Sequence, residues 1–317
     1  MSPSDPAPAG NGRLGASDLF MVLTTLVWGI NLSFIKISLR EMSPHAFNGV
    51  RLSVSALLYA IVLAAGRKTA RPLGRDVWKV LGLAVLGTTV YQWLFIRGIE
   101  HTTASTTSLI LAMTPVFVAV LSTALGYERI HWAAWLGIVI SFVGFYAVIA
   151  GPSLSFRLSG EALRGDLLLL AANLSWAVYT VLSRGILDRI PPLRLAALTA
   201  IPGTLLYLPL AARDMASQRY SGVSWGAWGG LFFSAVLAIF AGYIAWYYSL
   251  KRVGNAKTAI YSTLSPVFAV LFAALVLSEK IGPVQAAGAV VILAGVYLTR
   301  SGGRLFNHRK SFRGYTT

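Results

Sequence analysis

The sequence predicts an all-α integral membrane protein with ten transmembrane helices, arranged as two inverted five-helix repeats. The first observation behind this prediction is composition, because 56% of the 317 residues are hydrophobic and only 12% are charged, about half the charged share of a typical soluble protein. The second is a series of long apolar segments separated by short polar or basic ones. The third is an internal duplication, in which the same residues recur at a nearly fixed displacement.

Each predicted span is close to the ~20 residues that cross a ~30 Å hydrocarbon core. The first repeat, 18–150, contains the spans 18–38, 46–65, 77–97, 104–125 and 132–150. A loop at 151–165 precedes the second repeat, 166–300, with the spans 166–184, 194–212, 225–248, 256–277 and 283–300. Residues 1–17 and 301–317 are predicted to be disordered tails, the second of them strongly basic.

The charges between the spans predict the orientation of the chain. The formal net charge is +16, but the basic residues lie between apolar segments, which favours contact with a lipid bilayer and not with nucleic acid. Segments on one side carry 17 Lys and Arg, whereas those on the other side carry seven. Because positively charged loops stay in the cytoplasm, we expect a multi-pass protein of the cell inner membrane with both termini cytoplasmic.

The duplication is detailed enough to align the two halves. The matched pairs at a displacement of 148 are Asp18/Asp166, Trp28/Trp176, Leu39/Leu187 and Pro44/Pro192, and those at 151 are Pro115/Pro266, Phe117/Phe268, Glu128/Glu279, Gly137/Gly288 and Gly144/Gly295. Five helices are an odd number, so the second copy must enter the membrane from the opposite side. Many secondary transporters use such inverted repeats for alternating access to a site near the membrane midplane.

With these motifs the sequence resembles the EamA group of the drug/metabolite transporter superfamily. The residues that carry the resemblance are Val27-Trp28-Gly29, Lys36, Arg51, Trp176-Ala177, Arg184, and the proline motifs Thr114-Pro115-Val116-Phe117 and Ser265-Pro266-Val267-Phe268, which lead to Glu128 and Glu279. The resemblance covers about residues 18–300 and implies transport of small organic solutes. It leaves the solute open, because these families export amino acids, metabolites, amines and drugs alike.

Two matched tryptophans are the first candidates for a solute-binding site. Trp28 and Trp176 lie about ten residues into their helices, near the membrane midplane, although tryptophan usually prefers the interfaces. Asn31 and Asn173 lie three residues from them, on the same helix faces. These side chains are predicted to line an apolar cavity with a few orienting polar groups; the alternative is that the amides join helices as hydrogen-bonding partners.

Four further side chains are candidates for the wall of the same cavity, by position alone. They are Tyr91 and Gln92 in the third span, and Tyr243 and Trp246 in the eighth. The alternative for the aromatic ones is the belt of Tyr and Trp at a membrane interface.

Prolines and charges complete the predicted set. Pro115 and Pro266 lie within their spans and are expected to kink them, either as hinges for alternating access or as static bends. Helix-end charges are candidates for gate ion pairs or for exposed pairs of little energetic value. These residues are Lys36, Glu128, Arg184 and Glu279. Arg51 lies deeper in its span, where a charge requires a partner or a wet cavity.

Chemistry other than transport finds no candidate residues in the sequence. The chain has no cysteine, its four histidines are isolated, and no nucleotide-binding or nucleophile motif occurs. We therefore expect no enzyme, cofactor or metal site. The leading hypothesis is a secondary transporter that exports amino acids or related metabolites; the alternatives are a multidrug exporter, a metabolite or nucleotide-sugar exchanger, a substrate-uptake carrier, a lipid-active intramembrane enzyme and a non-transporting structural subunit. A homodimer is compatible with the sequence, which names no other partner than the solute and the bilayer.

Overall fold

The structure, a computed structural model, describes residues 16–65, 74–126, 132–150 and 160–311. Within these ranges every regular element is helical, as predicted. In chain order the elements are α1 (Ala16–Ser38), α2 (Pro44–Ala65), η1 (Gly74–Asp76), α3 (Val77–Ala84), η2 (Val85–Val90), α4 (Tyr91–His101), α5 (Ala104–Leu111), α6 (Thr114–Ala124), α7 (Trp132–Ala150), α8 (Glu161–Leu187), α9 (Pro192–Ser217), η4 (Tyr220–Gly222), α10 (Trp225–Phe233), η5 (Ser234–Ala241), α11 (Gly242–Tyr261), η6 (Ser262–Leu264), α12 (Ser265–Leu277) and α13 (Pro283–Ser311).

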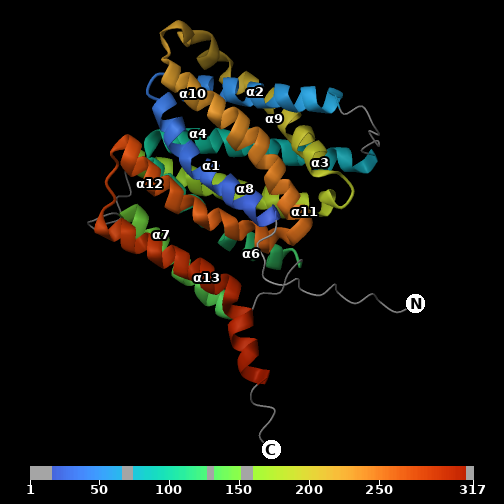
Figure 1. Cartoon of the computed structure of the whole chain (residues 1–317), viewed down its shortest axis with the longest axis vertical. Helices are drawn as coiled ribbons and strands as arrows, with labels where there is room; N and C mark the ends of the chain where they lie inside the picture. Colours follow the sequence, from blue (N-terminus) through green and yellow to red (C-terminus); the bar gives the residue numbers. More distant parts are fainter. Residues whose placement is uncertain (1–15, 66–73, 127–131, 151–159, 312–317) are drawn as a thin grey trace, which may run out of the picture.

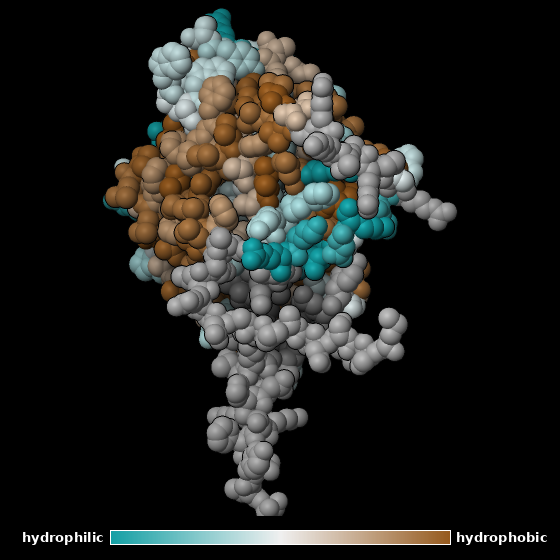
Figure 2. All heavy atoms as spheres, turned by 45° about the vertical axis from the view of Figure 1, so that its right-hand side comes forward, coloured by the Kyte–Doolittle hydropathy of each residue, from teal (hydrophilic) through white to brown (hydrophobic). Residues whose placement is uncertain are grey.

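The helices have the length and composition of membrane-spanning segments. Seven helical segments in the described ranges are long and apolar enough to cross a bilayer, and three shorter apolar ones accompany them. Large apolar side chains cover much of the outer surface, which Figure 2 shows as a broad hydrophobic face. A surface of this kind is stable in lipid, where helices satisfy their own backbone hydrogen bonds.

Helices from the two halves of the chain pack against each other throughout the bundle (Figure 1). Helix α1 contacts α10, α11 and α12, while α2 packs on α9 and α4 packs on α8. Helices α7 and α13 form a pair of their own beside the rest. A Cβ atom added to Gly144 would lie 2.6 Å from the carbonyl oxygen of Gly288, and one added to Gly295 equally close to that of Gly137. The matched glycines therefore bring these two backbones into direct contact.

Two spans contain π-helical segments that the sequence did not predict. Between α3 and α4 the backbone of η2 is π-helical, and so is that of η5 between α10 and α11. Single π turns within α-helices frequently occur at functional sites. The two segments occupy corresponding places in the two halves, in the third and the eighth predicted spans.

The two prolines begin helices instead of kinking them, which corrects the prediction of continuous spans. Helix α5 ends at Leu111 and α6 begins at Thr114, so Pro115 lies in the first turn of α6. Pro266 likewise lies in the first turn of α12, directly after the 3-10 turn η6. Proline is well tolerated at these positions, because an N–H group there would have no partner within the helix.

Two predicted boundaries also differ. Helix α13 continues to Ser311, so residues 301–311 are helical and not disordered; extending an existing helix costs less than nucleating a new one. Residues 249–255, predicted as a connection, are helical within α11. The chain still reverses there, because the hydroxyls of Ser249 and Thr258 are 3.0 Å apart, whereas nine residues of straight helix span about 13.5 Å.

Candidate functional site

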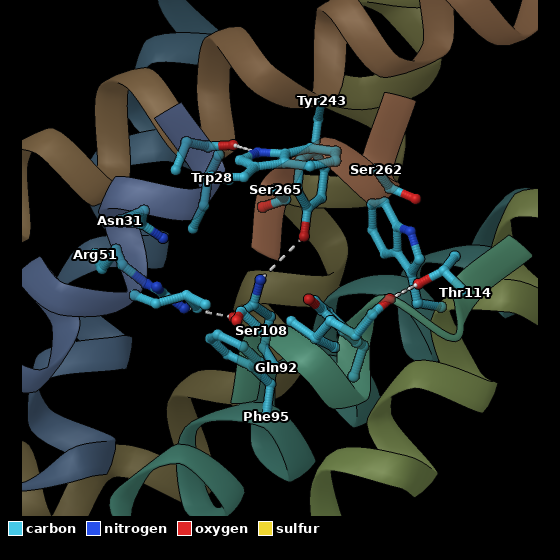
Figure 3. A pocket seen from close by; sticks show the side chains of 16 residues that line it. Trp28, Asn31, Arg51, Gln92, Phe95, Ser108, Thr114, Tyr243, Ser262 and Ser265 are labelled. Carbon is cyan, nitrogen blue, oxygen red and sulfur yellow. Dashed lines mark hydrogen bonds between the residues drawn. The ribbon is translucent and has the colours of Figure 1, made fainter. Parts of the chain in front are cut away.

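A cavity of about 90 Å³ lies in the middle of the bundle, between the two halves of the chain (Figure 3). Its volume corresponds to roughly six to nine water-sized positions, which is the scale of a small organic solute. Helices from both halves supply the wall. The lining residues are Trp28, Asn31, Leu32, Arg51, Tyr91, Gln92, Phe95, Ser108, Leu111, Thr114, Trp176, Ala238, Ile239, Tyr243, Ser262 and Ser265.

Closely packed aromatic rings form one wall of this cavity. The ring of Trp176 lies 6.2 Å from that of Trp28, edge to face, and 5.1 Å from the rings of Tyr91 and Tyr243. Trp246 packs on both tryptophans but does not border the cavity, so it supports the wall from behind. The structure thus brings the two matched tryptophans together from α1 and α8, which the duplication alone did not establish.

Trp28 is fixed by the π-helical segment η5. Its indole N–H donates a hydrogen bond of 2.8 Å to the carbonyl oxygen of Ala238. This acceptor lies inside the π-helical segment, whose backbone bonds run from i to i+5. Gly242 makes room for this arrangement, because an added Cβ would lie 2.6 Å from the indole nitrogen. The position of the ring therefore depends on the π segment and on a residue without a side chain.

Arg51 lies on the polar side of the cavity and is 1% exposed. Its guanidinium donates to the hydroxyl of Ser234 at 2.8 Å and to the side-chain carbonyl oxygens of Asn48 and Gln92, both at 2.5 Å. The amide of Gln92 in turn donates to the Tyr243 hydroxyl at 3.0 Å. This chain of bonds joins α2, α4, η5 and α11, and Figure 3 shows Gln92 between Arg51 and Tyr243.

The two asparagines have different surroundings. Asn31 borders the cavity, and its side-chain carbonyl oxygen is buried without a hydrogen-bond partner. Asn173 does not border the cavity; it donates to the carbonyl oxygen of Ile110 at 2.9 Å, and its oxygen accepts from Thr114 at 2.6 Å. These bonds hold α8 to the break between α5 and α6. The amides were predicted either to line the cavity or to join helices by hydrogen bonds, and Asn173 joins helices.

The helix breaks themselves face the cavity. Leu111 and Thr114 flank the break before α6, and Ser262 and Ser265 flank the one before α12. All four line the cavity. They are equivalent positions of the duplication at the displacement of 151, which is the signal that could have identified them in advance. The other missed lining residues, among them Phe95 and Ser108, carry no such signal.

The charged candidates lie at the two ends of the bundle. Glu279, a candidate for a gate ion pair, accepts bonds from the backbone N–H groups of Ala104 and Ser105, both at 3.0 Å, and from the Ser105 hydroxyl at 2.7 Å. We call this contact between the end of α12 and the start of α5 the Glu279 clamp. Beside it, Lys36 donates to the carbonyl oxygens of Ile99 and Thr102.

A second contact between the halves closes the same end. The carboxylate of Glu41, after α1, accepts the backbone N–H and the hydroxyl of Ser224, before α10, at 2.6 and 2.7 Å. These bonds from Ser224 lower the pKa of the Glu41 carboxyl. Ser43 donates its backbone N–H to Gln218 at 2.8 Å.

At the opposite end, Asp76 and Arg189 form an ion pair of 3.1 Å. Arg184 pairs with Asp188 at the end of α8 at 2.9 Å, on the surface. Glu128, the counterpart of Glu279, lies outside the described residues.

Comparison with protein families gives one match that extends over both halves. The model of the EamA-like transporter family matches residues 15–150 and, a second time, residues 163–301.

Individual relatives cover nearly the whole chain. An "Uncharacterized transporter" of Archaeoglobus fulgidus is 30% identical over 89% of this chain and 96% of its own. A "Probable terminal-alkyne amino-acid exporter" of Streptantibioticus cattleyicolor is 28% identical over 88% of this chain and 91% of its own. A "Probable amino-acid metabolite efflux pump" of Salmonella typhimurium is 28% identical, with 90% and 94% covered. A solved crystal structure shares the fold, with a TM-score of 0.68 at 17% identity over 92% of this chain and 98% of that one.

Proposed function

Since the chain belongs to the EamA-like transporter family, we propose that it is a secondary transporter that exports amino acids or related small metabolites by alternating access. The observation that carries this proposal is the central cavity, which is built from both halves and bordered by the breaks before α6 and α12. Two relatives named as an amino-acid exporter and an amino-acid metabolite efflux pump support the direction and the class of solute.

The proposed architecture is ten spans in two inverted repeats. The seven long apolar segments and the three shorter ones correspond in order to the predicted spans, and the family model matches the chain twice. Two halves of opposite orientation place equivalent helix breaks on both sides of one cavity. That arrangement is what alternating access around a central site requires.

In the proposed orientation the chain lies in the cell inner membrane with both termini in the cytoplasm, because the more basic loops remain on the cytoplasmic side. The Glu279 clamp and the Glu41–Ser224 contact then lie at the external end. Both contacts join residues of the first half to residues of the second. In the proposed transport cycle these two contacts hold the external end closed, while the Asp76–Arg189 ion pair joins the two halves at the opposite end.

Two alternatives differ in the solute. The aromatic wall is compatible with a multidrug exporter, but a cavity of about 90 Å³ favours small solutes. A nucleotide-sugar exchanger would need several basic groups for its phosphates, and Arg51 is the only charged side chain among the lining residues.

Efflux from proteoliposomes tests the proposal. Vesicles loaded with amino acids, amines, nucleotides and sugars are assayed by mass spectrometry, under imposed pH and sodium gradients. We expect amino acids or related metabolites to leave through the wild type and much more slowly through Trp28→Ala or Trp176→Ala. Trp225→Ala is the matched control, because that tryptophan is 91% exposed. No efflux of any solute under either gradient and in either orientation would leave a structural subunit as the better interpretation.

A further inference from the structure

Arg51 is a buried charge without a charged partner. Its three hydrogen-bond acceptors, Ser234, Asn48 and Gln92, are all neutral. Among the described residues no carboxylate lies within 4.0 Å of it. A buried cation is costly in a membrane protein unless a counter-charge or water compensates it. The acceptors that the described part of the chain supplies at this point are amide and hydroxyl oxygens.

The guanidinium also has hydrogen-bonding capacity left. Arginine carries five N–H donors, and three bonds account for three of them. The Nε–H group is buried and has no partner. Two phenyl rings, of Phe47 and Phe95, lie 5.3 and 6.0 Å from the guanidinium carbon. Rings hold a cation in place but do not neutralise its charge.

We propose that Arg51 binds the carboxylate of the transported solute. The inference rests on the proposed function and narrows it to small monocarboxylates, amino acids among them. Arg51 is the only charged residue among the described residues that border the cavity, so an anionic group on the solute supplies the missing counter-charge. Guanidinium–carboxylate bonds are among the strongest hydrogen bonds in proteins because both partners are charged.

The rest of the wall fits the other parts of an amino acid. Figure 3 shows Asn31 beside Arg51, and the side-chain carbonyl oxygen of Asn31, which has no hydrogen-bond partner, is a candidate acceptor for an ammonium group. Trp28, Trp176 and Tyr91 present ring surface to an apolar side chain. Gln92 connects Arg51 to Tyr243 by hydrogen bonds, so a carboxylate bound at Arg51 is linked through Gln92 to a ring of the aromatic wall. A solute with an amine and no carboxylate would instead meet an uncompensated positive charge.

The decisive experiment compares matched solutes on the wild-type protein in proteoliposomes. One set is valine, valinamide and 3-methylbutanoate, and a second set is phenylalanine, phenylalaninamide and 3-phenylpropanoate. Each compound is tested as a competitor of the efflux of a transported solute. We expect each carboxylate to inhibit that efflux at a concentration at least about tenfold lower than the corresponding amide, since a hydrogen bond to a charged group is worth that factor or more. Equal competition by an amide and its acid would overturn the inference while leaving transport intact. Absence of efflux for every solute would instead count against the proposed function.

Variants test the residue itself. Arg51→Gln is expected to lose the preference for the acid over the amide, and Arg51→Lys to retain part of it. Arg97→Gln is the control, because Arg97 does not border the cavity. Its guanidinium forms an ion pair of 2.7 Å with Glu100. Size-exclusion profiles and thermal unfolding identify a variant that fails to fold. In that case the comparison of acids with amides on the wild-type protein still tests whether the solute carboxylate is recognised. A folded Arg51→Gln protein that keeps the full preference would show that Arg51 only joins helices.

Discussion

Weakening the Glu279 clamp should open the end of the bundle that the proposed orientation places outside the cell. In Glu279→Gln the side chain keeps its shape but loses its charge, so the bonds from Ala104 and Ser105 are no longer charge-assisted. Hydrogen bonds to charged groups contribute roughly 1.5–3 kcal/mol, and partial exposure of Glu279 reduces this gain. A loss of about 1–2 kcal/mol changes the ratio of closed to open states roughly 5- to 30-fold.

The natural absence of cysteine makes this shift measurable. Ser108 lines the cavity and lies on α5, close to the clamp. A single Ser108→Cys change provides a label site for a membrane-impermeant maleimide, which is applied from the external face. We expect labelling to accelerate roughly 5- to 30-fold when Glu279→Gln is added, but not when Lys280→Gln, an exposed neighbour, is added instead. Equal labelling rates with and without Glu279→Gln would refute the role of the clamp in closure.

Three further predictions concern other contacts. Gly242→Ala should lower thermal stability by about 1–3 kcal/mol, because its methyl group would collide with the indole nitrogen of Trp28; Trp28→Phe should remove most of that penalty. Asn173→Ala should cost about 1–3 kcal/mol, since it breaks both bonds to the α5–α6 junction, and an unchanged melting temperature would contradict this. The bonds from Ser224 lower the pKa of Glu41, so this contact stabilises the folded state above the ordinary carboxyl pKa. The stabilisation is lost as pH falls through the lowered pKa. Glu41→Gln should therefore make the melting temperature less dependent on pH in this range.

The sequence was most informative where periodicity and duplication combine. Long apolar segments fix helical spans, because no other open structure satisfies the backbone in lipid. Matched pairs such as Trp28/Trp176 and Pro115/Pro266 identified elements that border the cavity. Equivalent positions in a repeat have equivalent surroundings, and for that reason Ser262 and Ser265 were also accessible to this reasoning.

Other features depend on packing that the local sequence does not record. The π segments η2 and η5 share no residue pattern that marks a π turn, and the bond from Trp28 to the carbonyl oxygen of Ala238 in η5 is seen only in the folded chain. Asn31 and Asn173 are chemically identical, yet one borders the cavity and the other joins α8 to α5. Glu279 was a candidate for an ion pair, but the sequence did not indicate the partners that it binds, which lie 174 and 175 residues away.

The most direct test of transport through the central cavity is to block that cavity. Efflux of an identified solute is measured through the Ser108→Cys protein before and after complete alkylation with N-ethylmaleimide, with the unmodified cysteine-free chain as the control. We expect alkylation to stop efflux in the cysteine variant alone, and saturating solute to slow the alkylation. Full alkylation of the residue at 108 with undiminished efflux would contradict a pathway through the space between the two halves.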